Sequence, residues 1–194
     1  LLPHYSVEPV PEAEAEARAA AARALALDPD RGEAHAALGS MAWTVWRRDE
    51  AEAEYRRAVE IDSGYATAHL WYGNFLSLRG RGEEALAEHT RALELDPVSL
   101  PAHMGYGAAL NQHRRYDEAI EVYRKALALD PGYVAAHNNL INPYLCLGRL
   151  DDALDEMETA SRLGHDGLPR DFVREVRAGY EAGGERGFWE AILE

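Results

Sequence analysis

Short runs of apolar and alanine residues with helical spacing recur along this chain, separated by charged and turn-forming residues. The pattern returns every 34 residues, and each run closes on an aspartate: Asp28, Asp62, Asp96 and Asp130. Other residues keep the same step, among them His35, His69, His103 and His137, and Ala51, Ala85, Ala119 and Ala153. Several series in one register indicate a repeat architecture, which usually serves to bind partners.

Two helices are predicted in each 34-residue unit, because each unit contains two stretches of helix-forming residues. They cover residues 33–46 and 49–61, 67–79 and 82–95, 101–113 and 117–129, and 134–147 and 151–163. An arginine followed by acidic residues marks the turn between them, as at Arg81, Glu83 and Glu84. Positive charge closing one helix and negative charge opening the next both oppose the local helix dipole.

The pattern divides the chain into an extended lead-in, a half-repeat helix, four full units and a pair of capping helices. These segments are residues 1–11, 12–31, 32–65, 66–99, 100–133, 134–167 and 168–194, in that order. After Leu163 the register is lost, and Gly183 and Gly184 separate two last helices at 170–181 and 185–193. Atypical end helices cover the apolar face that a terminal repeat would expose. We therefore predict an all-α solenoid.

The charge of the chain argues against whole classes of partner. Its 194 residues carry a formal net charge of −14, without a basic tail or face. We expect no nucleic acid to bind this segment, because phosphate attraction is lacking, and an anionic membrane surface is an equally poor partner. No apolar stretch reaches the roughly 18 residues of a spanning helix. The single cysteine, Cys146, is compatible with a reducing compartment, and we expect a cytoplasmic protein.

Fixed positions within the unit carry characteristic residues. With Gly32 as position 1, position 8 is glycine in three units, position 20 is alanine throughout, and position 24 is large, as Tyr55, His89, Tyr123 and Met157. This pattern resembles the tetratricopeptide repeat family over residues 12–166. It departs from the family in placing histidine at position 4 and Ile141 at position 8 of the last unit, where we expect a less regular helix contact. The resemblance implies antiparallel helix pairs in a right-handed superhelix, whose concave groove binds peptides or partner proteins.

The resemblance also implies which side chains face that groove, since first helices line it. The predicted groove residues are Trp43, Leu70, Asn74, Met104, Asn111, Gln112, Asn138 and Asn142. Amides can pair with the N–H and C=O groups of a peptide, while Trp43 and Met104 supply adaptable contact area. The alternative, which we weigh equally, is that asparagine is merely tolerated on a curved solvent face.

The histidine series is the first suspect for chemistry, because imidazole is a common metal ligand and general base. Equivalent positions on stacked helix pairs lie roughly 10 Å apart, too far to share a metal. We expect each ring to pack between helices and to donate to a carbonyl or carboxylate, and such rings would make stability fall below pH 6. Cys146 fits no nucleophile signature, and no phosphate-binding loop is present. We therefore predict no catalytic residue, metal or cofactor.

Pro143 interrupts the pattern of a first helix. Its ring removes one backbone donor and crowds the carbonyl of Asn139, so we expect a kink or break beside Asn138 and Asn142. Such a distortion would either shape a binding site or be a tolerated defect.

These observations favour a non-catalytic scaffold for protein–protein interaction. The stretches 96–101 and 180–189 are similar to repeat regions joined to bacterial signalling modules, including winged-helix regulators, cyclases and protein kinases. That similarity implies the interaction or sensing region of a larger bacterial regulatory protein. Two alternatives stay open: a self-association module that forms homo-oligomers through its terminal helices, and a small-molecule sensor with a pocket around Trp43 and Trp71.

Overall fold

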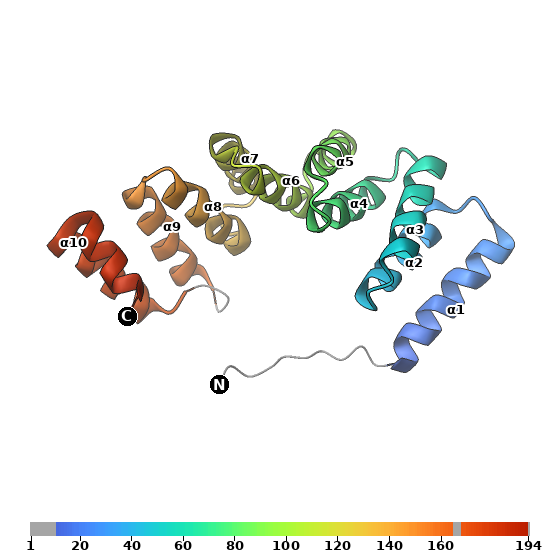
Figure 1. The fold of residues 1–194 in the computed structure, drawn as a ribbon, viewed down its shortest axis with the longest axis horizontal. Helices are drawn as coiled ribbons and strands as arrows, with labels where there is room; N and C mark the ends of the chain where they lie inside the picture. The colour runs from blue at the N-terminus through green and yellow to red at the C-terminus, as the bar shows by residue number, and fades with distance from the viewer. Residues whose placement is uncertain (1–10, 165–167, 194) are drawn as a thin grey trace. The chain divides into compact units, whose positions relative to one another are not determined.

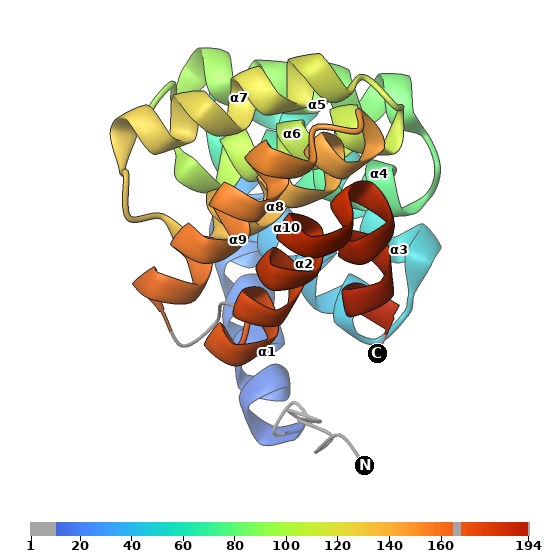
Figure 2. The same ribbon diagram turned by 90° about the vertical axis from the view of Figure 1, so that its left-hand side faces the viewer.

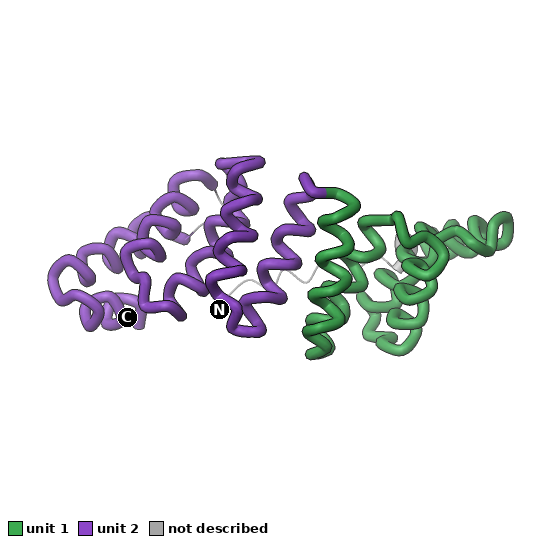
Figure 3. The backbone as a smooth tube through the Cα atoms, turned by 90° about the horizontal axis from the view of Figure 1, so that it is seen from above, with its two compact units in different colours: residues 1–96 green, residues 97–194 purple. Residues whose placement is uncertain are grey.

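The computed structural model describes residues 11–164 and 168–193, and every regular element in these ranges is a helix (Figure 1). The chain divides into two compact units, residues 1–96 and residues 97–194 (Figure 3). The predicted lead-in falls almost wholly outside the described residues. Its last residue, Pro11, begins the first helix, where proline costs no hydrogen bond.

In the first unit, the described residues 11–96 form five helices: α1 (Pro11–Leu27), α2 (Gly32–Thr44), α3 (Arg48–Ile61), α4 (Ala66–Leu78) and α5 (Gly82–Leu95). Consecutive helices α2 and α3, and likewise α4 and α5, pack along each other as pairs. Helix α4 also contacts both members of the preceding pair, and α1 lies against α2.

The second unit repeats this arrangement with α6 (Leu100–Gln112), α7 (Tyr116–Leu129), α8 (Val134–Cys146), α9 (Leu150–Leu163) and α10 (Arg170–Leu193). Helices α6 and α7 form one pair, α8 and α9 the next, and α8 contacts both α6 and α7. Helix α10 lies beside α9 (Figure 2). The predicted all-α stack of helix pairs is thus confirmed within each unit.

All four first helices end in the same hydrogen-bonded turn. The N–H of an arginine bonds the carbonyl five residues earlier, as from Arg47 to Ala42 at 2.9 Å and from Arg81 to Leu76 at 3.0 Å. The residue before each arginine has a positive φ, namely Trp46, Gly80, Arg114 and Gly148. This is the Schellman ending of a helix, whose left-handed residue is usually glycine.

The same arginines also begin the second helices. Each pairs with the acid three residues later, for example Arg81 with Glu84 at 2.6 Å and Arg149 with Asp152 at 2.7 Å. The acid stands in the first turn of its helix, where the dipole favours negative charge. The prediction that arginine and acid mark the turn is confirmed, although the arginine precedes the second helix instead of closing the first.

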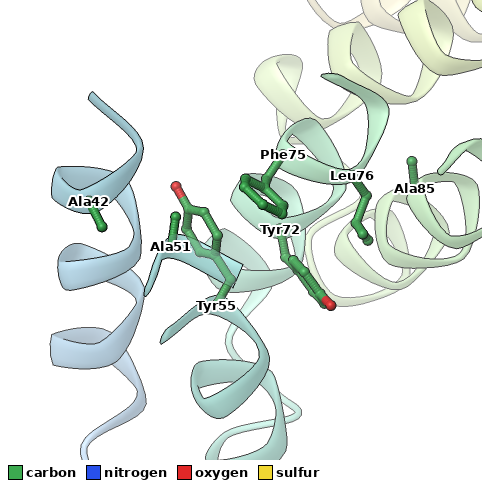
Figure 4. Packing of buried hydrophobic residues seen from close by; sticks show 7 residues of the cluster. All are labelled: Ala42, Ala51, Tyr55, Tyr72, Phe75, Leu76 and Ala85. Carbon is green, nitrogen blue, oxygen red and sulfur yellow. The ribbon is translucent and has the colours of Figure 1, made fainter. Parts of the chain in front are cut away.

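Close helix contact within a pair depends on glycine beneath a ring. In the first unit Tyr55 lies over Gly39, where a Cβ atom would come within 2.8 Å of its ring. Tyr55 continues into an aromatic and alanine core with Tyr72 and Phe75, which Figure 4 shows between α2 and α5. The predicted roles of positions 8 and 24 therefore belong to one contact, in which a small residue admits a large one.

In the last pair, α8 and α9, other residues make the contact between positions 8 and 24. Ile141 replaces the glycine, and the facing residue is the unbranched Met157 instead of a ring. Both side chains pack into one apolar cluster that also holds Val173 and Phe188 of α10. Helices α8 and α9 still pack along each other. The expected irregularity at Ile141 is absent, because a flexible thioether adapts to the larger partner.

Helix α10 consists of two halves, as the glycine pair predicts. The backbone leaves the helical region at Gly184, with φ 60° and ψ −143°. The halves then meet so closely at Gly179 and Gly187 that a Cβ on Gly179 would lie 2.6 Å from the Gly187 carbonyl. This folded end buries Val173, Val176 and Phe188 against α9. That these two halves cap the last repeat stays a prediction.

Candidate functional site

The predicted groove residues lie on the first helices of the pairs. Trp43 is on α2, Leu70 and Asn74 are on α4, Met104, Asn111 and Gln112 are on α6, and Asn138 and Asn142 are on α8. Helix α2 contacts α4 in the first unit, and α6 contacts α8 in the second. Each unit therefore presents neighbouring first helices.

In the first unit most of this surface is used for packing. The Trp43 ring is half-buried and stands edge-on to Phe75, with ring centroids 5.4 Å apart. Leu70 is 8% exposed and belongs to the core. Asn74 is exposed. The two apolar residues thus offer a ligand little free area beside one exposed amide.

In the second unit two of the predicted residues meet. The Asn111 Nδ2 group on α6 donates a hydrogen bond to the Asn142 Oδ1 atom on α8 at 3.1 Å. The Cys146 thiol, one turn after Asn142, contacts the same oxygen at 3.7 Å. The amide pair therefore joins adjacent first helices across the surface that the sequence assigns to the groove.

The amide pair keeps unused hydrogen-bonding groups. The Asn111 Oδ1 atom is buried and has no hydrogen-bond partner in the described part of the chain. Asn142 is exposed, and its amide oxygen accepts the bonds just described. An asparagine amide can donate two hydrogen bonds and accept two. The exposed Asn142 amide can therefore donate to a ligand through its Nδ2 group, and the buried Asn111 Oδ1 atom is left without a partner.

Met104 lies next to a further amide that the sequence analysis did not place in the groove. The Asn139 Nδ2 group donates to the Ala135 carbonyl at 2.9 Å and lies 3.7 Å from the Met104 sulfur. Gln112 is exposed at the end of α6, and Asn138 is half-buried on α8. The run of asparagines at 138 and 139 was the available signal for this part of the surface.

Pro143 does not break its helix. Helix α8 continues through this residue to Cys146, so the expected break is wrong. The missing N–H of Pro143 leaves the Asn139 carbonyl without its usual helical donor. The helix nevertheless continues, and the Leu147 N–H donates to the Pro143 carbonyl at 3.1 Å. The Pro143 ring is buried. A broken backbone therefore contributes nothing to the surface.

The histidines at position 4 hold helices together. His69 lies 2.6 Å from Glu88 on the second helix of its pair and 3.3 Å from the Ser63 carbonyl before its own helix. The same two contacts recur for His35, with Glu54 and Pro29, and for His137, with Glu156 and Pro131. The expected role between helices is confirmed, and we name each set a histidine staple.

The third repeat departs from this arrangement. His103 contacts the Ser99 carbonyl at 2.9 Å, and the position that holds glutamate in the other units is Val122. The glutamates recur at the 34-residue step, in Glu54, Glu88 and Glu156. That series was visible in the sequence and could have identified the partner of each histidine.

A different histidine lacks partners. His89 occupies position 24, where two other units have tyrosine, and it is fully buried over Gly73. Neither ring nitrogen has a hydrogen-bond partner among the described residues. Burial disfavours the charged ring and lowers the pKa of His89 from 6.5 to about 4.

Residues 11–164 and 168–193 contain no group of three or more histidine, cysteine or acidic side chains placed to hold a metal ion. No helix in the same ranges has both the length and the apolar character that crossing a bilayer requires.

Comparison with known families agrees with the helix pairs. Two family models described as tetratricopeptide repeat match residues 47–99 and 79–134, and residues 110–170, which together are more than half of the chain. The chain belongs to the tetratricopeptide repeat family. No curated protein matches this tetratricopeptide repeat chain in sequence.

Solved structures share the fold of this tetratricopeptide repeat protein at low sequence identity. A structure described as Pseudomonas aeruginosa pilF is 22% identical with a TM-score of 0.77, covering 94% of this chain and 82% of the other. MamA is 23% identical with a TM-score of 0.67, covering 75% and 85%. YrrB, described as having an unusual peptide-binding site, is 22% identical with a TM-score of 0.67, covering 80% of each chain. These similarities establish the fold.

Proposed function

We propose that this tetratricopeptide repeat protein is a non-catalytic scaffold that binds an extended peptide or a segment of a partner protein along α6 and α8. The observation that carries the proposal is the Asn111–Asn142 amide pair, which links the two helices on the side predicted to bind. The repeat family and the peptide-binding site described for YrrB support the same class of function.

The chemistry of this surface suits a peptide backbone. Each peptide group offers one N–H and one C=O, and an amide side chain can answer both at once. The Met104 side chain, half-buried beside Asn139, can adapt its shape to an apolar residue of the ligand.

The wider setting of the scaffold is a further part of the proposal. The stretches similar to bacterial regulatory proteins favour an interaction or sensing region within a larger protein. A cytoplasmic location agrees with a single cysteine and with the acidic composition. Self-association and small-molecule sensing remain alternative predictions; Trp43 and Trp71, which the second would use, both pack partly buried against the core of the first unit.

The proposal is tested by selecting displayed random peptides on the full chain and measuring their affinity for variants. We expect Asn111→Ala with Asn142→Ala to weaken binding of the selected peptides at least about tenfold. Peptide N–H and C=O groups that are buried in the complex without hydrogen-bond partners are costly. Lys125→Ala on α7, an exposed residue of a second helix, is the matched control and should leave affinity unchanged. Peptides that bind the double variant as tightly as the original chain would show that α6 and α8 are not the binding surface.

A further inference from the structure

Trp46 is a bulky residue in a backbone conformation that usually belongs to glycine. Its φ is 60°, and the equivalent residues of the second and fourth repeats are Gly80 and Gly148. Left-handed φ brings the Cβ atom of an ordinary residue too close to its own backbone. The Trp46 side chain is also 68% exposed, so burial does not compensate for the conformation. A strained, exposed aromatic residue on a surface is a reason to look for a ligand.

The surroundings of Trp46 fix its ring in place. The ring centroid of Trp46 lies 5.5 Å from that of Trp43, which is itself packed on Phe75. The guanidinium carbon of Arg48 lies 5.3 Å from the Trp46 ring centroid. These contacts hold an aromatic surface at the turn between α2 and α3 before any ligand arrives, which lowers the entropy lost on binding.

Trp46 borders an open surface hollow of about 760 Å³ in the first unit. Its lining consists of Trp46, Arg47, Arg48, Asp49, Glu50 and Arg79. The hollow therefore joins the α2–α3 turn to the equivalent turn of the next repeat, which contributes Arg79.

Two of the arginines that line the hollow are available to pair with a ligand. Arg47 and Arg18 both bond Glu50, so this carboxylate is already neutralised. Arg48 and Arg79 have no carboxylate partner within the described residues. Asp49 is the remaining acid, and it stands in the first turn of α3, where the helix dipole stabilises it. On a chain of net charge −14, this is a local excess of guanidinium groups beside an aromatic ring.

We propose that this hollow, the Trp46 site, binds an acidic peptide segment, independently of the surface on α6 and α8. An apolar side chain of the peptide packs on Trp46, and its carboxylates receive hydrogen bonds from Arg48 and Arg79. Guanidinium groups bind carboxylates with good geometry, and a ring combined with arginine is typical of binding hot spots. A long polyanion such as nucleic acid would be repelled by the rest of the chain, so a short acidic segment fits best.

The test measures binding by the fluorescence polarisation of a fluorescein-labelled peptide in which glutamates surround one leucine. A second peptide, with lysines in place of the glutamates, tests whether binding depends on the negative charge. Binding of the acidic peptide should weaken at least about tenfold in Trp46→Gly and in Arg48→Ala with Arg79→Ala. Trp46→Gly should also raise Tm by about 2–4 °C, because glycine relieves the left-handed strain. A gain in stability together with a loss of binding is not expected of a residue that serves only the fold.

Arg114→Gly is the matched control, since Arg114 has the same turn position and a φ of 59°. Arg114→Gly should raise Tm in the same way and leave the affinity for the acidic peptide unchanged. The double variant Asn111→Ala with Asn142→Ala should also leave that affinity unchanged. Equal affinity for the lysine peptide, undiminished binding to Trp46→Gly, or displacement by inorganic phosphate as effective as by unlabelled peptide would each overturn the proposal.

Discussion

At the scale of single residues, the repeat tolerates substitutions whose physical consequences differ sharply. Position 24 needs a side chain large enough to cover the glycine of the facing helix, and Tyr55, His89 and Tyr123 all meet that need. A tyrosine ring carries no charge at neutral pH, whereas an imidazole can acquire one. His89 therefore makes a packing position sensitive to pH.

Stability should fall as the pH drops through the range in which unfolded His89 is protonated and folded His89 is not. The folded pKa is depressed to about 4 from 6.5, so the unfolded chain binds the proton first and acid favours unfolding. Between pH 7 and pH 5 this residue should cost about 2 kcal/mol of unfolding free energy. Denaturant titration at the two pH values measures it.

His89→Tyr, the residue of the neighbouring repeats, should remove most of that pH dependence. His113→Gln, which changes an exposed histidine after α6, is the control and should retain it. An identical loss at pH 5 in His89→Tyr would contradict the assignment to His89. The sequence had pointed to the position-4 histidines for this effect, because burial and partners cannot be read from a periodic series alone.

At the scale of helices, the histidine staple connects three parts of the chain. Through His69 it ties α4 to the second helix of its own pair and to the loop that precedes α4. Both partners are acceptors, and the His69 and Glu88 side chains are 8% and 22% exposed. Removing one partner leaves the other poorly solvated, which makes the staple a stabilising element of the pair.

Glu88→Val should lower the unfolding free energy by about 1–3 kcal/mol, because the His69 ring loses its partner in a site with little access to water. Valine is the residue that the third repeat has at this position. Glu94→Val near the end of the same helix makes the same change of side chain but breaks only an exposed ion pair with Arg91, so a much smaller loss is expected. Equal losses in thermal or denaturant unfolding would show that the staple contributes nothing.

The sequence predicts the helices and turns well where one residue type recurs every 34 residues. The aspartates and alanines located the helices, and the arginines located the turns. It did not reveal Trp46 as strained, since φ is a property of the folded turn, although its register with Gly80 and Gly148 contained the clue. It predicted a kink or break at Pro143, because the pattern does not show that α8 stays helical around the buried proline ring. Of the groove residues, it could not distinguish the buried Leu70 from the exposed Asn74.

At the scale of the whole molecule, the last helix decides whether the apolar end of the second unit meets water. Helix α10 covers Leu154 and Met157 with Val173, Val176 and Phe188. Its own outer face keeps Trp189 38% exposed and Leu193 84% exposed. The face that covers the cluster should prevent self-association, whereas the exposed Trp189 and Leu193 would favour it. Mass measurements distinguish these two expectations.

Removing residues 170–194 should lower Tm and cause association that increases with concentration, because the cluster around Leu154 loses its cover. Light scattering of the full chain should give a monomer mass at all concentrations, and Leu193→Ser should not change it. A full chain whose mass grows with concentration would favour the self-association alternative. A truncated chain as stable as the full one would contradict the capping role of α10.

The histidine staple also restricts where such a protein can gain or lose residues. Each histidine reaches a carbonyl six residues earlier, as His35 reaches Pro29, and a glutamate nineteen residues later. One residue inserted before the histidine would change its spacing to the carbonyl, and one inserted after it would change its spacing to the glutamate. Addition or deletion of complete 34-residue units leaves every such spacing intact, so the array can change length by duplication far more readily than any of its loops can.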